Sequence, residues 1–272
     1  HQIVLRLRKN SSFIVYDFSR KTNNNKKSTV VDVRDDQNLI YQINEIKPDI
    51  IINCVGVLVG ASSKDVGNAA YINSYLPHRL KRYCDLSDSK LIHISTDCVF
   101  SGTKGGYLED AVKDGTGVYA QTKSIGEVDG PAHLMLRTSI VGPELKGDGT
   151  GLFDWFMKQK GEVRGFTKSI WSGVTTVELS KIIEQAIVQN LCGLYHVTNG
   201  ESISKYELLM LFNKYSNKKI NVVKVDKKLI DKSILDTRQE LRYQIPDYNQ
   251  MVDEMIQFIR LNHELYQHYQ LK

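Results

Sequence analysis

The chain has 272 residues and a formal net charge of +5, with 41% hydrophobic and 25% charged residues. This composition is typical of a globular protein and excludes collagen-like repeats, low-complexity disorder and a small disulfide scaffold. The charge excess is mild and the apolar runs are too short to cross a bilayer, so we expect neither nucleic acid nor a membrane as a partner. Four widely spaced cysteines without zinc spacing predict a reducing, cytoplasmic compartment and no metal site.

Short apolar runs alternate with helix-like segments through the first half of the chain. The chain opens inside a helix, because Ile3, Val4 and Leu7 have helical spacing. The expected strands are 13–16, 29–33, 49–55, 91–95 and 134–138, and the expected helices are 36–46, 65–85 and 118–127. This alternation predicts an α/β fold, a Rossmann-type doubly wound parallel sheet.

The pattern of expected helices and strands changes after Gly142 and Pro143. We expect a Gly-rich lid loop over 144–151, helices over 152–160, 177–189, 204–215 and 248–266, and strands over 193–197 and 220–225. The sequence therefore predicts a sheet domain over residues 1–143. Residues 144–272 are expected to form mainly a small C-terminal lobe, with segments that return to the sheet.

The clearest chemical signal is the pair Tyr119 and Lys123, four residues apart on a predicted helix. This spacing places both side chains on one face, where an ammonium can lower the phenol pKa from its usual value near 10. Alone, the pair is equally typical of a helix surface. However, Thr96 ends one buried strand and Asn53 ends another, and ligands of open α/β sheets bind beyond the carboxyl ends of strands.

Several motifs, in order along the chain, resemble a known family. They are Ser95–Gly102, Gly106–Asp110, Tyr119–Lys123, Arg137–Gly142 and Gly193–Val197. Together they resemble an extended short-chain dehydrogenase/reductase of the dTDP-4-dehydrorhamnose reductase type. The resemblance implies an NADP-dependent reductase of a nucleotide-diphosphate 4-keto-6-deoxy sugar, in deoxysugar and surface polysaccharide biosynthesis, with a dinucleotide in the sheet domain and the substrate under the lobe.

The resemblance also implies roles for individual residues. The catalytic residues would be Thr96, Tyr119 and Lys123. The cofactor-binding residues would be Ser19, Arg20, Lys21, Asp32, Val33, Asn53, Cys54, Val55, Gly56, Asn73 and Lys123. The substrate-binding residues would be Asp97, Val99, Phe100, Arg137, Trp155 and Trp171, with lobe packing as the alternative for the two tryptophans.

The cofactor prediction depends on the end of the second strand of the fold. Arg20 and Lys21 stand where a carboxylate would accept a ribose 2′-hydroxyl, and arginine favours a phosphate. This favours NADP(H), with NAD(H) as the alternative, for which Asp17 is the argument.

The chain departs from the family in two ways. Cys98 and Ser101 stand where the family usually has Tyr and Asp. The family's Gly-x-x-Gly-x-x-Gly turn is absent, so we expect the first strand and this turn to lie upstream of the sequence. Two other functions stay open: an epimerase or dehydratase that retains NAD, and a non-catalytic subunit that binds a sugar nucleotide or dinucleotide. A homodimer is compatible with all three.

Overall fold

The computed structural model describes residues 1–20, 28–227 and 229–271. A parallel sheet with the strand order β10-β5-β4-β3 forms its centre, and a separate parallel pair joins β1 to β2. The strands are β1 (Asp17–Ser19), β2 (Ser28–Val30), β3 (Ile50–Asn53), β4 (Lys90–Thr96), β5 (Leu134–Thr138) and β10 (Gly193–His196). The α/β prediction with a parallel sheet is therefore confirmed.

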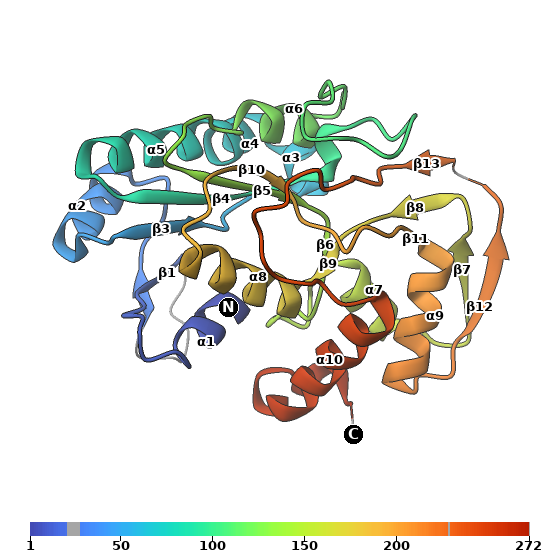
Figure 1. Cartoon of the computed structure of the whole chain (residues 1–272). Helices are drawn as coiled ribbons and strands as arrows, with labels where there is room; N and C mark the ends of the chain where they lie inside the picture. The colour runs from blue at the N-terminus through green and yellow to red at the C-terminus, as the bar shows by residue number, and fades with distance from the viewer. Residues whose placement is uncertain (21–27, 228, 272) are drawn as a thin grey trace.

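Helices cover both faces of this sheet (Figure 1). One face carries α2 (Asp36–Ile46), α3 (Val59–Lys64), α4 (Val66–Ala69), the π-helical segment η1 (Ala70–Tyr75), α5 (Leu76–Ser87) and α6 (Val118–Ile125). The other carries α1 (Gln2–Leu7), packed on α8 (Thr176–Val188). Local sequence sets these bounds: Asp35 caps the start of α2 by accepting from the Asn38 amide, and Lys47 ends it in the left-handed conformation.

A smaller lobe lies beside the central sheet (Figure 1, right). Its elements are α7 (Leu152–Lys158), β7 (Glu162–Phe166), β8 (Ser169–Trp171), β11 (Ile203–Ser204), α9 (Lys205–Ser216), β12 (Asn221–Val225), β13 (Ile230–Asp231), α10 (Tyr248–Leu261), η3 (His263–Leu265) and η4 (Gln267–Tyr269). The short parallel pair β6 (Ile140–Val141) and β9 (Val174–Thr175) connects it to the sheet.

The lobe shares a hydrophobic core with the central sheet. Leu136 of β5, Ile182 of α8, Phe212 of α9 and Met255 of α10 belong to one buried cluster. Because β10 and α8 also come from the second half of the chain, residues 144–272 contribute to the main layers as well as to the lobe.

Some predicted boundaries were wrong. The first strand was placed at 13–16 but forms at Asp17–Ser19, where Asp17 bonds Arg8 and Ser28 and so ties β1 to β2. Ile14 stays 87% exposed, so its apolar character did not indicate a buried strand. The long helix over 65–85 is continuous from Val66 to Ser87 but passes through the π-helical η1. The strands β7, β8 and β13 were not predicted, because they are short and flanked by polar residues.

Candidate active site

The candidate site lies beyond the carboxyl ends of β3, β4 and β5. The register pairs Asn53 with His93 and Thr96 with Thr138, so these three parallel strands end at one edge of the sheet. Helix α6 covers this edge with Tyr119 and Lys123 on one face. Gly115 lets the start of α6 approach the turn after β4, because a side chain there would meet the Cys98 carbonyl at 2.7 Å.

Thr96 and Tyr119 meet at this edge. Thr96 caps the 3-10 turn η2 (Asp97–Val99) by accepting from the Cys98 amide at 3.1 Å, which fixes its hydroxyl, and it donates to the Asp97 carboxylate at 3.2 Å. The Thr96 side chain also lies close enough to the Tyr119 phenol to act on its pKa. The structure thus brings together the hydroxyl and the phenol that the sequence predicted, 23 residues apart in the chain.

The pKa of Tyr119 does not follow the expectation. Burial raises the pKa of its phenol to about 12, the negative charges of Cys98 and Asp97 act in the same direction, and the interaction with Thr96 opposes them. Lys123 does not lower it, because the Lys123 ammonium lies against the sheet, where it donates to the Ile94 carbonyl at 2.8 Å. The expected activation of the phenol by this lysine is therefore absent from this structure, and Tyr119 is a protonated acid at neutral pH.

Lys123 is buried beside His93 of β4. The ammonium is 4% exposed and donates to His93 Nε2 at 3.3 Å, which assigns the imidazole proton to Nδ1. Burial lowers the pKa of Lys123 to about 8. An ammonium has three donors, so these two bonds leave one for a ligand. No local sequence pattern marks His93, because its contact is with a lysine 30 residues away.

The loop after β3 has the character of a ligand-binding edge. The Asn53 carboxamide accepts from the Val55 amide at 3.1 Å, while its buried Nδ2 has no hydrogen-bond partner among the described residues. Cys54, Val55 and Gly56 are exposed. A side chain at Gly56 would make an ordinary 3.6 Å contact with Asn73, so the space beside this glycine is open to a ligand.

Asn73 positions this loop rather than facing a ligand itself. It is fully buried in η1, accepts from the Val57 amide at 2.8 Å, and donates to the Val57 carbonyl at 3.0 Å and to the Thr122 hydroxyl at 3.2 Å. These bonds tie the loop after β3 to α6, next to Lys123. The π-helical turn around Asn73 is typical of a functional site.

The expected nucleotide-reading residues lie at the ends of β1 and β2. Ser19 ends β1, Arg20 follows it and is exposed, and Lys21 lies outside the described residues. The Asp32 carboxylate is bound by Arg34, whose hydrogen bond lowers the pKa of Asp32 to about 2. Val33 packs against a small cluster that contains Val57. Arg20 is close enough to contribute to that shift.

Three residues predicted to bind substrate are buried in the protein. Val99 and Phe100 are fully buried, and Phe100 stacks on Tyr107 with ring centroids 4.2 Å apart. Arg137 is 2% exposed, and its guanidinium donates twice to Glu127, at 2.9 and 2.7 Å, and bonds His196 at 2.7 Å. Each of these side chains already has partners within the protein, and the substrate roles of the three residues stay predictions.

The two tryptophans also differ from expectation. Trp155 is 39% exposed on α7, and no described contact joins it to Thr96 or Tyr119. Trp171 is 3% exposed and donates from its indole to the Ser139 hydroxyl at 2.7 Å, so it is not an open stacking platform. Its ring instead carries the Lys205 ammonium at 5.1 Å from the centroid, a contact the sequence analysis missed. Asp97 is buried next to Thr96, and its substrate role stays a prediction.

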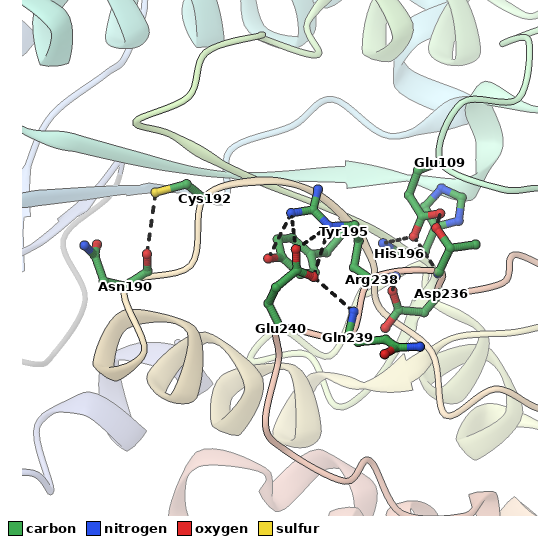
Figure 2. Close-up of polar contacts among 10 residues, drawn as sticks. Glu109, Asn190, Cys192, Tyr195, His196, Asp236, Arg238, Gln239 and Glu240 are labelled. Atoms are coloured by element: carbon green, nitrogen blue, oxygen red, sulfur yellow. Dashed lines mark hydrogen bonds and ion pairs between the residues drawn. The ribbon is translucent and has the colours of Figure 1, made fainter.

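A segment without regular secondary structure passes along β10, the edge strand of the central sheet. Figure 2 shows residues 236–240 running past β10, where Glu109 accepts from the Thr237 amide and hydroxyl at 3.1 and 2.7 Å. Arg238 lies over the Tyr195 ring at 4.5 Å and pairs with Glu240. These contacts fasten the chain between β13 and α10 to the central sheet, and so hold the lobe beside the site.

Among residues 1–20, 28–227 and 229–271, no group of three or more metal-ligating side chains is found. The same residues contain no helix with the length and apolar character needed to cross a membrane.

A parallel sheet with a hydroxyl and a phenol beyond its strand ends, and a lysine one turn along the same helix, is typical of the Rossmann-type short-chain oxidoreductases. The family model described as RmlD substrate binding domain matches residues 6–257, and the chain belongs to this family. Solved structures support the assignment. A hypothetical dTDP-4-dehydrorhamnose reductase from Sulfolobus tokodaii is 25% identical, with 92% of this chain and 95% of that chain covered and a TM-score of 0.77.

A dTDP-4-dehydrorhamnose reductase from Bacillus anthracis, solved with NADP, is 26% identical, with 85% and 87% covered and a TM-score of 0.73. Among curated relatives, a probable glycan biosynthesis reductase of Haloferax volcanii is 30% identical over 41% of this chain. A dTDP-4-dehydrorhamnose reductase of Aggregatibacter actinomycetemcomitans is 28% identical over 61% of it. These matches span 39% and 60% of the two relatives' own lengths. The chain therefore shares its fold with proteins named as sugar-nucleotide reductases, and it spans less than two thirds of the length of the two curated relatives.

Proposed function

We propose that this protein reduces the 4-keto group of a nucleotide-diphosphate 6-deoxy sugar, with a nicotinamide dinucleotide as the hydride source and NADP(H) as the preferred form. The observation that carries the proposal is the contact between Thr96 and Tyr119 beyond β4, with Lys123 one helical turn away. The names of the relatives support the substrate class.

The residues of the sheet edge fit a dinucleotide. The unpartnered Asn53 Nδ2, the exposed loop over Cys54–Gly56 and the third donor of Lys123 are polar groups at the carboxyl ends of adjacent strands, the usual place for such a ligand. When bound, the reduced nicotinamide supplies the hydride. In this proposal, residues 1–143 bind the dinucleotide and residues 144–272 mainly bind the substrate.

The chain's own residues carry out the acid chemistry. Tyr119, protonated at neutral pH because burial raises its pKa to about 12, donates its proton to the carbonyl oxygen as negative charge develops there. Thr96 hydrogen-bonds the same oxygen and is held in place by the Cys98 amide. Lys123 binds a ribose hydroxyl with its third donor and so helps to hold the dinucleotide in place.

The preference for NADP(H) is supported at the end of β1. Asp17, the group that would favour NAD(H), is bound by Arg8 and by the Ser28 hydroxyl, so its carboxylate is already engaged by protein. Arg20 is exposed next to it and has the geometry to bind a 2′-phosphate through two parallel hydrogen bonds.

A panel of 4-keto-6-deoxy nucleotide sugars, assayed by the loss of NADPH absorbance, tests the proposal. We expect stoichiometric oxidation of NADPH with release of oxidised cofactor at each turnover. Retention of the cofactor without net oxidation would instead identify an epimerase or dehydratase. Binding of sugar nucleotides without turnover of any of them would identify a non-catalytic binding subunit.

A further inference from the structure

Lys205 occupies a position that is unfavourable for a cation. It is the first residue of α9, directly after the capping residue Ser204, where the helix dipole opposes positive charge. Its side chain is neither fully buried nor exposed, and burial lowers the pKa of its ammonium to about 8. The capping box between Ser204 and Glu207 would form with any residue at this position, so helix formation does not explain a lysine there.

The surroundings of Lys205 do not neutralise it. Its ammonium lies over the Trp171 ring at 5.1 Å, and within the described residues it forms no hydrogen bond or ion pair. Asp97 and Cys98 are the groups whose charges act on it, and neither forms an ion pair with it within 4 Å. A buried ammonium without a hydrogen-bonded counterion costs free energy unless something else completes the site.

Lys205 also faces the reacting end of the candidate site. Trp171 is anchored to Ser139, the residue that follows β5, and Thr138 of β5 pairs with Thr96 of β4. Asp97 directly follows Thr96, and a second lobe residue, Lys232, acts on the same carboxyl group. Two lysines of the lobe thus face one aspartate at the strand ends, so this side of the site has an excess of positive charge.

We propose that Lys205 is a substrate-binding residue that recognises an anionic oxygen of the sugar nucleotide, with Trp171 as the platform that aims its ammonium. Two sources share this chemistry: the diphosphate linkage, and a carboxylate on the sugar ring. The inference rests on the proposed function, because it assigns the lysine to the substrate of the same site. It explains why an unneutralised cation is kept beside the indole.

The test compares Lys205→Met with Lys214→Met. Lys214 lies on the same helix, and its ammonium also lies over an aromatic ring, Tyr215, at 4.6 Å, but at the opposite end of α9. Methionine keeps an unbranched apolar side chain that is one atom shorter, and it removes the charge together with its hydrogen-bond donors. Calorimetry would measure the affinity of the whole chain for UDP-glucose, dTDP-glucose and UDP-glucuronate, which requires no turnover.

We expect Lys205→Met to weaken binding by about ten- to a hundredfold, the usual effect of a charge-assisted hydrogen bond, and Lys214→Met to leave it unchanged. Equal weakening for all three probes identifies the diphosphate, and weakening confined to UDP-glucuronate identifies a carboxylate. Unchanged affinity for every probe overturns the inference while NADPH turnover still supports the proposed function. A wild-type chain that binds none of the probes overturns both.

The unfolding temperature of the ligand-free variant gives a second measurement. A lysine that serves the substrate and not the fold predicts that Lys205→Met is at least as stable as the wild type, since the variant removes an unpaired buried charge. A fall of several degrees with unchanged affinities would show that Lys205 is a packing residue and would overturn the inference.

Discussion

Three polar side chains lie four residues apart along one face of α6 and the turn after it: Tyr119, Lys123 and Glu127. They differ in how burial and hydrogen bonds shift their pKa values. Glu127 accepts from Ser95 at 2.6 Å and from Arg137, and pairs with Lys113. Burial raises its pKa, but these bonds outweigh burial and the net shift is downward. At Tyr119 and Lys123, burial instead dominates and favours the neutral forms.

The difference lies in the partners rather than in the depth of burial. At Glu127 every charge has a counter-charge within the protein, as in a structural network. At the Tyr119 end, part of the hydrogen-bonding capacity is left to a ligand. This segment therefore carries an ion-pair network at Glu127 that is complete within the protein, and hydrogen-bonding groups near Tyr119 that are left for a ligand. Substitutions at the Glu127 end should mainly lower stability, and substitutions at the Tyr119 end should mainly lower activity.

The largest expected effect is on activity at the Tyr119 end. Tyr119→Phe removes the proton donor and keeps the ring, so kcat for reduction of a 4-keto sugar nucleotide should fall by about 10²–10⁴-fold while the unfolding temperature changes little. Tyr41→Phe, at an exposed position of α2, is the matched control and should retain full activity. Undiminished turnover in Tyr119→Phe would remove the basis of the proposed function.

The next effect is on stability at the Glu127 end. Arg137→Met leaves the buried Glu127 without its main partner, so the free energy of unfolding should fall by about 3–5 kcal/mol in denaturant titrations. Adding Glu127→Leu should recover part of this loss, because it removes the unpaired charge. The folded fraction should keep its KM for the sugar nucleotide. A stable Arg137→Met protein with a raised KM would support the substrate role that the sequence predicted for Arg137.

These two ends also show what sequence can and cannot reveal. The strands β3, β4 and β5 were predictable, because each is a continuous apolar run, and Tyr119 and Lys123 were predictable from their spacing on one helix. The structural partners of Arg137 were not predictable, because His196, one of them, lies 59 residues away and no local pattern encodes such a contact. For Lys205 the sequence does contain a signal that the prediction did not use: a lysine stands in the first position of a capped helix, where a cation is unfavourable.

A third prediction concerns pH and Lys123. Its pKa is about 8 in the folded protein and about 10.4 in an unfolded chain, so the unfolded state binds more protons between these values. Below pH 8 the buried charge destabilises the fold fully, and this cost disappears as pH rises toward 10.4. Relative to Lys123→Met, the wild-type chain should therefore gain stability over this window, by on the order of 1–3 kcal/mol.

Denaturant titrations of the cofactor-free protein between pH 7 and pH 10 measure this difference. A constant offset between Lys123→Met and the wild type reflects packing, and only its slope with pH reports the buried ammonium. Lys214→Met, on the exposed part of α9, should run parallel to the wild type. A stability difference between Lys123→Met and the wild type that does not depend on pH would show that Lys123 is solvated in the folded chain, like a surface lysine, and is not buried at a ligand site.

The smallest expected effect lies at Arg20, outside both networks. If Arg20 binds the 2′-phosphate, Arg20→Ala should raise the KM for NADPH by about tenfold and leave the KM for NADH nearly unchanged, because only NADPH carries that phosphate. The effect should shrink at high salt, since the arginine is exposed. Arg82→Ala, at an exposed position of α5, controls for the loss of one positive charge. Equal losses for both cofactors would mean that the end of β1 is a solvated surface, and that the preference between NADP(H) and NAD(H) is set elsewhere.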